Sequence, residues 1–307
     1  MSRSDRVSMG LSEVRTVVLG VQILIGFQYQ GIFQDAFDEI PRSAKLTEPA
    51  SLILLLIAFA CMVAPASFHQ MAERGNATIA QDRYTRLMVA LALVPFAASI
   101  GLDVYMALCR HYPSTAAIGC GLAASLLAAF MWFGLENLVR PERTLDHKRD
   151  KIDEPTPLKE KLTELLTESR IILPGVQALL GLQFAAYLTS GFDKLSRLSQ
   201  DVHTVSLFLL VVAMILLMAP APFHRLAEHG EDTRRVEKLS ETLILASLIP
   251  LSFALAGDLF VVLQRTMHSI SLATAGALLT VAATLSLWFG LPLLARKGRA
   301  YAVLAAT

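Results

Sequence analysis

The sequence predicts an all-α membrane protein with eight transmembrane helices in two four-helix repeats. The first observation is composition: of 307 residues, 54% are hydrophobic and 17% are charged, whereas a soluble domain has about a quarter charged residues. The second is that the apolar residues gather in runs long enough to cross a bilayer as helices. The third is that the second half of the chain repeats the first. The eight predicted spans are 17–37, 50–66, 87–108, 116–135, 171–189, 204–221, 243–263 and 270–294.

The repeat becomes visible when the chain is offset by 155 residues. "APASFHQMAERG" in the first half then matches "APAPFHRLAEHG" in the second, and the "WFGL" motif recurs after one inserted residue. This register pairs the polar residues Gln22, Gln28 and Asp103 with Gln177, Gln183 and Asp258. We therefore divide the chain into a first repeat (1–136), a charged linker (137–167) and a second repeat (168–307).

The even number of spans in each repeat fixes their relative orientation. Both repeats must enter the membrane from the same side, so we expect them to be parallel and related by a pseudo-twofold axis along the membrane normal. The positive-inside rule places both termini and the linker in the cytoplasm. Only six of the 27 Lys and Arg residues then lie in outer loops: Arg42, Lys45, Arg110, Lys194, Arg197 and Arg265.

The linker ends in a stretch that favours an amphipathic helix. Leu158, Leu162, Leu165 and Leu166 lie on one face of the helix predicted for "LKEKLTELLTESR". A helix of this kind lies on the cytoplasmic surface of the bilayer. An ordinary linker helix packed on a cytoplasmic loop explains the same pattern.

The predicted first and fifth spans carry glutamines that are unusual in lipid-facing helices. Gln22 and Gln177 share a helix face with Gly26 and Gly181, respectively. Small residues allow helices to approach closely, and amides can hydrogen-bond across such a crossing. One hypothesis is that the glutamines only hold the two spans together. The other is that Gln22, Gln28 and their copies line a path for a cation.

Asp103 and Asp258 are the strongest candidates for a functional site. Intramembrane carboxylates are expensive, and they usually face the bundle interior or water. Pro95 and Pro250 precede them by eight residues, and a proline inside a helix leaves a carbonyl unbonded. We expect each aspartate to bind an ion and to face an aqueous cavity open to the outer side. The alternative is an interhelical bond without a transport role.

Further charged residues flank the spans on both sides. At the outer ends, Asp38 and Asp193 predict an acidic vestibule that concentrates cations. At the inner ends, the residues predict a cytoplasmic gate or an interfacial network, and histidine titration near neutral pH could sense protons. These inner residues are His69, Glu73, Arg15 and Glu13 in the first repeat and His224, Glu228, Arg170 and Glu168 in the second.

Several functions are not expected. The chain contains no HExxH, GxSxG, Walker A or GxGxxG motif, so we predict no enzyme activity and no cofactor. "LAGD" at 255–258 is a fragment of the GxGD motif of intramembrane aspartyl hydrolases, which remains a remote alternative. A net charge of +1 argues against nucleic-acid binding. Three cysteines without counterparts in the second repeat argue against a shared metal site or disulfide.

Each half resembles a family of uncharacterised bacterial integral membrane domains with four spans. The resemblance rests on "ESRIILPGVQALLGLQF" at 168–184, on "APAPFHR" at 219–225 and on their first-half counterparts. It implies a bacterial membrane location. The plan of two fused repeats is also similar to the lysosomal potassium-channel family, although the FSD motif of that family is missing here.

These observations favour a cation channel or a proton-linked cation transporter in the bacterial inner membrane. The expected partners are the lipid bilayer, a monovalent cation or proton, and a second copy in a homodimer. A non-transporting structural or accessory membrane protein is the alternative, in which every intramembrane polar group serves packing.

Overall fold

The computed structural model describes residues 3–76, 78–134, 157–229 and 231–304, excluding the side chains of residues 3–16 and 298–304. These ranges contain helices and no strand. The first repeat comprises α1 (Arg3–Gly31), α2 (Ala36–Glu39), α3 (Arg42–Met71), α4 (Ile79–Leu108), α5 (Ser114–Ala129) and the π-helix η1 (Phe130–Gly134). The second comprises α7 (Leu158–Ala186), α8 (Ser190–Asp193), α9 (Arg197–Met218), α10 (Pro220–Leu226), α11 (Arg234–Met267), α12 (Ile270–Leu285), η2 (Ser286–Gly290) and α13 (Leu291–Leu304).

The prediction of an all-α, multi-pass membrane protein is confirmed. Within the described residues, 7 helices are long and apolar enough to cross a membrane. The first of the eight predicted spans lies in α1, whose apolar part has only 15 residues, Val17–Gly31. Hydroxyl side chains cap several of these helices: Thr78, Thr233 and Ser269 each accept a backbone N–H in the first turn.

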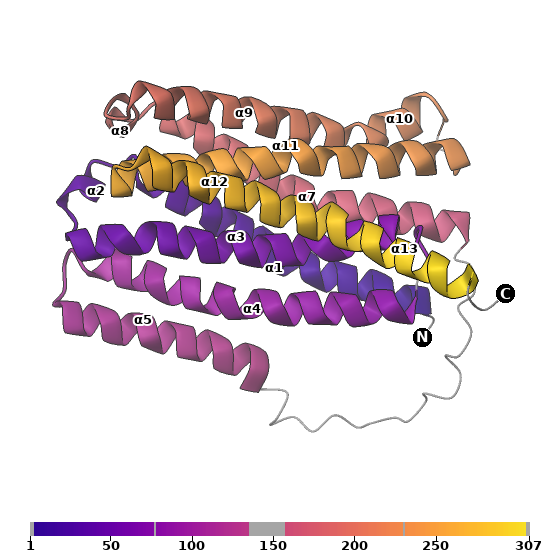
Figure 1. Cartoon of the computed structure of the whole chain (residues 1–307), viewed down its shortest axis with the longest axis horizontal. Coiled ribbons are helices and arrows are strands. Elements are labelled where there is room, and N and C mark those ends of the chain that lie inside the picture. The colour runs from indigo at the N-terminus through magenta and orange to yellow at the C-terminus, as the bar shows by residue number, and fades with distance from the viewer. Residues whose placement is uncertain (1–2, 77, 135–156, 230, 305–307) are drawn as a thin grey trace.

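The long helices run side by side along the longest axis of the molecule (Figure 1). In the same view α1 begins and α13 ends at one end of the bundle, while the short helices α2 and α8 lie at the other end. Both repeats therefore run in the same direction, as the even number of predicted spans requires.

The amphipathic stretch before the second repeat is not a separate helix. It forms the first turns of α7, which continues without interruption from Leu158 to Ala186. Leu162 and Leu165 of the predicted apolar face are buried, and Lys161 Nζ donates to the Arg74 carbonyl at 2.8 Å. Burial of these leucines within the chain favours the second interpretation, a linker helix packed on a loop, over a helix that lies on the bilayer surface.

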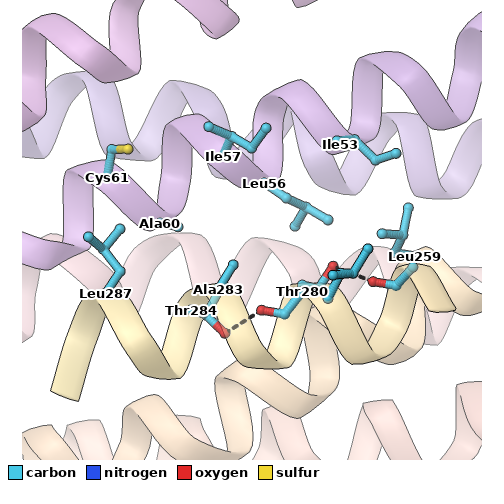
Figure 2. A pocket seen from close by; sticks show the side chains of 12 residues that line it. Ile53, Leu56, Ile57, Ala60, Cys61, Leu259, Thr280, Ala283, Thr284 and Leu287 are labelled. Atoms are coloured by element: carbon cyan, nitrogen blue, oxygen red, sulfur yellow. Dashed lines mark hydrogen bonds between the residues drawn. The ribbon is translucent and has the colours of Figure 1, made fainter. Parts of the chain in front are cut away.

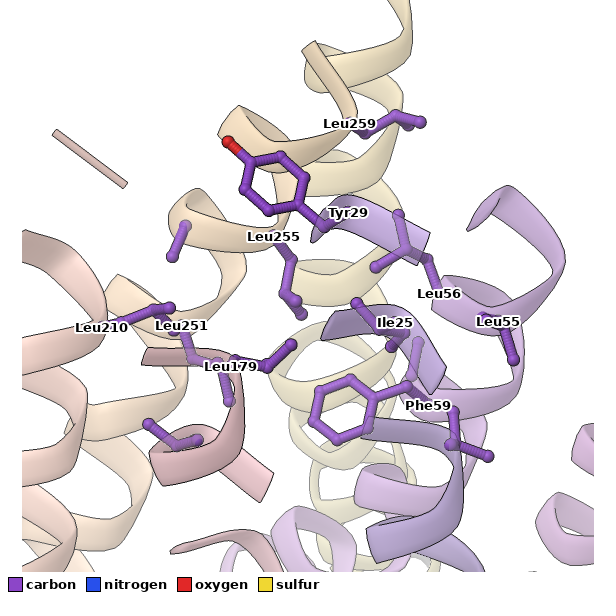
Figure 3. Packing of buried hydrophobic residues seen from close by; sticks show 14 of the residues in the cluster. Ile25, Tyr29, Leu55, Leu56, Phe59, Leu179, Leu210, Leu251, Leu255 and Leu259 are labelled. Atoms are coloured by element: carbon purple, nitrogen blue, oxygen red, sulfur yellow. The ribbon is translucent and has the colours of Figure 1, made fainter. Parts of the chain in front are cut away.

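One continuous apolar core joins the two repeats. In Figure 3, Ile25 and Phe59 of the first repeat point toward Leu179, Leu210 and Leu255 of the second. Since these side chains are at most 2% exposed, the repeats form one packed unit within the described residues.

The predicted pseudo-twofold relation between the repeats is not confirmed. A twofold axis makes every contact between repeats occur twice with the partners exchanged. Helix α3 packs against α11, α12 and η2, but its repeat equivalent α9 makes no extensive contact with α4, α5 or η1. The repeats therefore use different surfaces to contact each other.

Candidate functional site

The first buried polar cluster joins α1, α3 and α4. Gln28 Nε2 donates to Ser51 Oγ at 2.5 Å and also to Asp103 Oδ1, and Ser51 Oγ donates to the same carboxyl oxygen at 2.6 Å. Glu48 lies one turn before Ser51 on α3, so it faces the same side. We call Gln28, Glu48, Ser51 and Asp103 the Glu48 cluster.

Glu48 is the most unusual member of this cluster. It is 1% exposed, and neither carboxyl oxygen has a hydrogen-bond partner among the described residues. Its carboxyl group is close enough to Asp103 to interact electrostatically. Two buried like charges repel strongly in a low-dielectric site. The pair therefore needs a proton or a cation between the two groups.

The second buried polar cluster joins α7, α9 and α11 with a tyrosine from α1. Gln183 Nε2 donates to Asp258 Oδ1 at 2.6 Å. The Tyr29 hydroxyl bonds to His203 Nδ1 at 2.5 Å and lies close enough to Asp258 for electrostatic interaction. We call Gln183, His203, Ser206 and Asp258 the His203 cluster.

The two clusters occupy equivalent positions in the repeats. The offset of 155 residues pairs Gln28 with Gln183, Ser51 with Ser206 and Asp103 with Asp258. It also pairs Glu48 with His203, the one position of the four at which the repeats differ. One repeat therefore buries two acids, and the other buries an acid and a base.

Aromatic rings surround His203 on several sides. The Tyr29 ring stacks on the imidazole at a centroid distance of 5.6 Å, and Tyr187, Phe192 and Phe33 contact it at 4.8, 5.3 and 5.8 Å. His203 is itself fully buried, so these rings hold the imidazole in a largely apolar surround.

Asp103 and Asp258 do not share one environment. Asp258 is 1% exposed, so the expected opening to water is not present there, whereas Asp103 is partly exposed. In each carboxyl group Oδ1 accepts a hydrogen bond, while Oδ2 is buried without a hydrogen-bond partner among the described residues.

The second pair of predicted glutamines divides between two roles. Gln22 is fully buried at the crossing of α1 and α7, and its Nε2 atom bonds weakly to the Ile172 carbonyl at 3.4 Å. A Cβ atom on Gly175 would collide with the Gln22 side chain. These contacts are the ones that the packing hypothesis expects, while the Gln22 Oε1 atom is buried without a hydrogen-bond partner among the described residues. Gln177, in contrast, is exposed and lines no interface between the repeats within the described residues.

Cationic partners neutralise most of the predicted outer acidic vestibule. Asp38 pairs with Arg265 at 2.7 Å and with Lys194 at 3.0 Å, and Lys194 also contacts Asp35 at 3.1 Å. A hydrogen bond from Ser190 holds the pKa of the Asp35 carboxyl below its usual range. Burial alone raises the pKa of Asp38, but the bond and charge of Lys194 and the charge of Arg265 lower it overall. Asp193 is exposed.

At the end of the bundle where α1 begins, a histidine of the first repeat reaches the second repeat. His69 Nδ1 bonds to Glu168 at 2.7 Å, and Gln70 Nε2 donates to the other oxygen of Glu168 at 2.7 Å. Glu164 lies 3.6 Å from the second nitrogen of His69. These side chains are all at most 5% exposed, so they join α3 to α7 in a buried network.

The remaining predicted inner residues are less closely connected. Glu73 is buried near this network. His224 lies 3.7 Å from Asp232, Glu228 pairs with Arg235 at 3.5 Å, and Arg170 is exposed. The side chains of Arg15 and Glu13 lie outside the described residues.

A separate apolar cavity of about 310 Å³ lies between the repeats. Figure 2 shows Ile53 and Ile57 of α3 on one side of it and Thr280, Ala283 and Leu287 on the other. Its lining includes no residue of either polar cluster. The described residues contain no group of three His, Cys, Asp or Glu side chains that could hold a metal ion.

Sequence analysis identified four of the eight cluster residues as site candidates, and it missed Glu48, Ser51, His203 and Ser206. Glu48 and His203 lie just before the predicted second and sixth spans, which begin at residues 50 and 204. In the structure α3 begins at Arg42 and α9 begins at Arg197. Glu48 and His203 therefore lie in the second turn of their helices. The repeat register carried the missing signal, since it aligns two titratable residues of opposite character at one position.

The fold and the clusters define a multi-pass helical membrane protein built from a tandem repeat, with a buried titratable group pair in each half. The sequence matches the Family of unknown function (DUF6328) twice, over residues 2–136 and 155–292. The chain therefore belongs to this family. The second match begins before residue 168, so it includes the inner turns of α7. No curated protein and no solved structure matched the sequence.

Proposed function

We propose that this chain is a proton-linked cation transporter in which the two polar clusters bind and release the transported ions. The observation that carries the proposal is the set of buried carboxyl oxygens without donors. Both oxygens of Glu48 and one oxygen each of Asp103 and Asp258 are in this state among the described residues. Ionisable groups inside a membrane mark ion and proton pathways.

The chemistry of the Glu48 cluster supports proton linkage. Glu48 and Asp103 can hold one proton and one negative charge, or a bare cation between two carboxylates. A cation entering this site displaces a proton, and its departure lets the proton return. Gln28 and Ser51 donate to Asp103 and therefore hold that carboxyl group in place for either occupant.

We further propose that α1 is the eighth span and that the chain lies in the bacterial inner membrane with both termini cytoplasmic. Its apolar part is short, but α1 lies beside α7 at the centre of the bundle, where protein rather than lipid satisfies its polar residues. Cysteine labelling of intact cells tests this topology. Modification of Lys194→Cys from outside and of Lys148→Cys only after permeabilisation is expected; the reverse pattern would overturn it.

The decisive experiment is ion flux in liposomes containing the purified protein and a pH-sensitive dye, scanned over monovalent cations. Asp103→Asn combined with Asp258→Asn is expected to abolish cation-dependent proton movement while the protein remains folded. Asp201→Asn is the matched control, since that carboxylate is exposed, pairs with Arg197 and belongs to neither cluster nor to the predicted vestibule, and it should leave flux unchanged. Unchanged flux in the double variant would remove the role that we assign to the clusters.

A second candidate is a non-transporting accessory membrane protein, and one observation favours it. Gln28 and Gln183 donate directly to Asp103 and Asp258, as expected of polar groups that hold helices together. Absence of flux for any cation at any pH would support this function. The intramembrane aspartyl hydrolase gains no support, because the two aspartates belong to separate hydrogen-bond clusters.

A further inference from the structure

The contacts between the repeats run in one direction only. Residues of one face of the first repeat pack into the second repeat, and the repeat equivalents of those residues are exposed. The comparison can be made at four places along the helices, and each place gives the same result.

Near the inner half of the bundle, the contact is a glutamine against a glycine. Gln22 of α1 is fully buried against Gly175 of α7. The equivalent residues are Gln177 and Gly20. Gln177 is exposed, and a side chain added at Gly20 would meet nothing within 4 Å. The equivalent contact is therefore not formed within the chain, and both Gln177 and the space beside Gly20 lack a partner from the other repeat.

A second contact four residues further along repeats the pattern. A Cβ atom on Gly26 would collide with Leu182 of α7. The equivalents are Gly181, which has nothing within 4 Å, and Phe27, which is 59% exposed. Here too, the space beside Gly181 is empty, and Phe27, the side chain that would fill it, is exposed.

Toward the outer end, aromatic residues of α1 enter the second repeat. Tyr29 is 1% exposed and Phe33 is fully buried, with the Phe33 backbone tight against Gly191. Their equivalents on the second repeat, Phe184 and Leu188, are 52% and 90% exposed.

The fourth comparison involves the tryptophans. Trp288 of η2 is fully buried and its Nε1 atom donates to the Ala60 carbonyl of α3 at 2.9 Å. The equivalents are Trp132 of η1, which is partly exposed and stacks on its own repeat's Phe96, and Ile215 of α9, which is 57% exposed.

We infer that the vacant faces bind each other in a second copy of this chain. When two repeats join through two different faces, each repeat keeps one face that contacts nothing. Interfaces of this kind extend to further copies and form closed rings or open filaments. The second-repeat face comprises Gln177, Gly181, Phe184, Leu188 and Ile215, and the first-repeat face comprises Gly20, Phe27 and Trp132. Every residue of the two faces is exposed or partly exposed in the single chain, so both faces are accessible to a second copy.

Two copies place four repeats around one axis, and we propose that this closed dimer is the functional assembly. Each second-repeat face then packs on the first-repeat face of the other copy, so the assembly has no vacant face left. Gln177 favours a second copy of the chain, rather than lipid, as the partner of the second-repeat face. In an isolated chain Gln177 faces hydrocarbon, which is unfavourable for an amide, whereas the dimer places it against Gly20 as Gln22 lies against Gly175.

The glycine vacancies allow a sharp test. Because Gly20 and Gly181 have open space around them within the chain, Gly20→Leu and Gly181→Leu should fold normally. In the dimer each leucine would collide with the other copy. We expect a two-copy mass for the parent in lipid nanodiscs, and a one-copy mass for each variant with an unchanged thermal midpoint.

Two control substitutions separate this result from general effects. Val94 is 60% exposed and its repeat equivalent Ile249 is 46% exposed, so Val94 belongs to neither face. The Val94→Leu variant should therefore remain a dimer. Gly175→Leu strikes the internal contact and should lower the thermal midpoint sharply. A parent protein of one-copy mass, or dimers that persist in both vacant-glycine variants, would overturn the proposal.

Disulfide crosslinking identifies which faces meet. In a chain with Cys61, Cys109 and Cys120 replaced by serine, Gly20→Cys with Gln177→Cys should form a covalent dimer on oxidation. Gln177→Cys alone should not, because the proposed faces differ. Crosslinking by the single variant would show a symmetric interface and overturn the head-to-tail arrangement. A ladder of longer products would show an open filament and overturn the closed dimer.

Discussion

The Glu48 cluster and the His203 cluster share three of four residues but differ in how they are stabilised. Asp103 Oδ1 accepts hydrogen bonds from both Gln28 and Ser51, whereas Asp258 Oδ1 accepts one from Gln183 and its Oδ2 atom has no partner within the described residues. His203 is held by Tyr29, while Glu48 has no donor there. The comparison teaches that duplication preserved the aspartate and its glutamine while the fourth position changed the charge that the site can hold.

The largest expected difference comes from removing the glutamines. Gln183→Leu leaves Asp258 buried without its donor, and the loss of a buried partner costs about 2 kcal/mol. Gln28→Leu leaves Ser51 bonded to Asp103, so we expect a loss nearer ~1 kcal/mol. Thermal unfolding of both variants in detergent checks the order. Equal losses would mean that Ser51 does not compensate for Gln28.

Substitution by leucine at the position where the clusters differ should change the free energy of unfolding with opposite signs in the two repeats. Glu48→Leu removes a buried carboxyl group without donors, so we expect a gain of about 1 kcal/mol. His203→Leu deprives the buried Tyr29 hydroxyl of its partner and should lower stability by ~1 kcal/mol or more. If Glu48 binds the transported proton, the stabilised variant should also lose proton-coupled flux. Destabilisation by Glu48→Leu would contradict our description of this carboxyl group.

Tyr29→Phe tests the hydrogen bond that joins Tyr29 of the first repeat to His203 of the second. The ring and its stacking on His203 remain, so only the hydrogen bond is lost, at about 1 kcal/mol. Phe184 is the exposed repeat equivalent of Tyr29. In the monomeric chain, Phe184→Leu should change the free energy of unfolding by less than ~0.5 kcal/mol. A loss in Tyr29→Phe no larger than in this control would mean that the bond contributes little.

The smallest effect belongs to the outer ion pairs. The lowered pKa values of Asp35 and Asp38 mean that their contribution is complete above the ordinary value of 3.8 and is lost as the pH falls below it. The raised pKa of Lys194, caused mainly by hydrogen bonds from Lys194 to Asp38 and Asp35, means that its contribution is complete below 10.5 and is lost above it. Lys194→Met should therefore lower the thermal midpoint slightly and equally between pH 5 and pH 9, because such exposed pairs are weak. A pH-dependent difference inside that range would point to another group.

The sequence predicted the helices and the aspartate clusters better than the contacts between repeats. Hydrophobic runs predicted the spans, and the cost of an intramembrane carboxylate indicated Asp103 and Asp258. The same reasoning failed for Gln177, which matches Gln22 in sequence but is exposed. Residue type is inherited by both repeats, whereas burial depends on which neighbour each repeat meets, and that neighbour is not encoded locally.

The difference between Glu48 and His203 also bears on how such a molecule arises. An assembly of identical single repeats carries the same residue at this position in every subunit, so a change from acid to base alters all sites at once. Fusion of two repeats in one chain releases that constraint. Each half can then mutate independently while the ratio of acid-acid to acid-base sites stays fixed at one to one. The covalent link thus sets the stoichiometry of two unlike sites, which no change in subunit concentration can disturb.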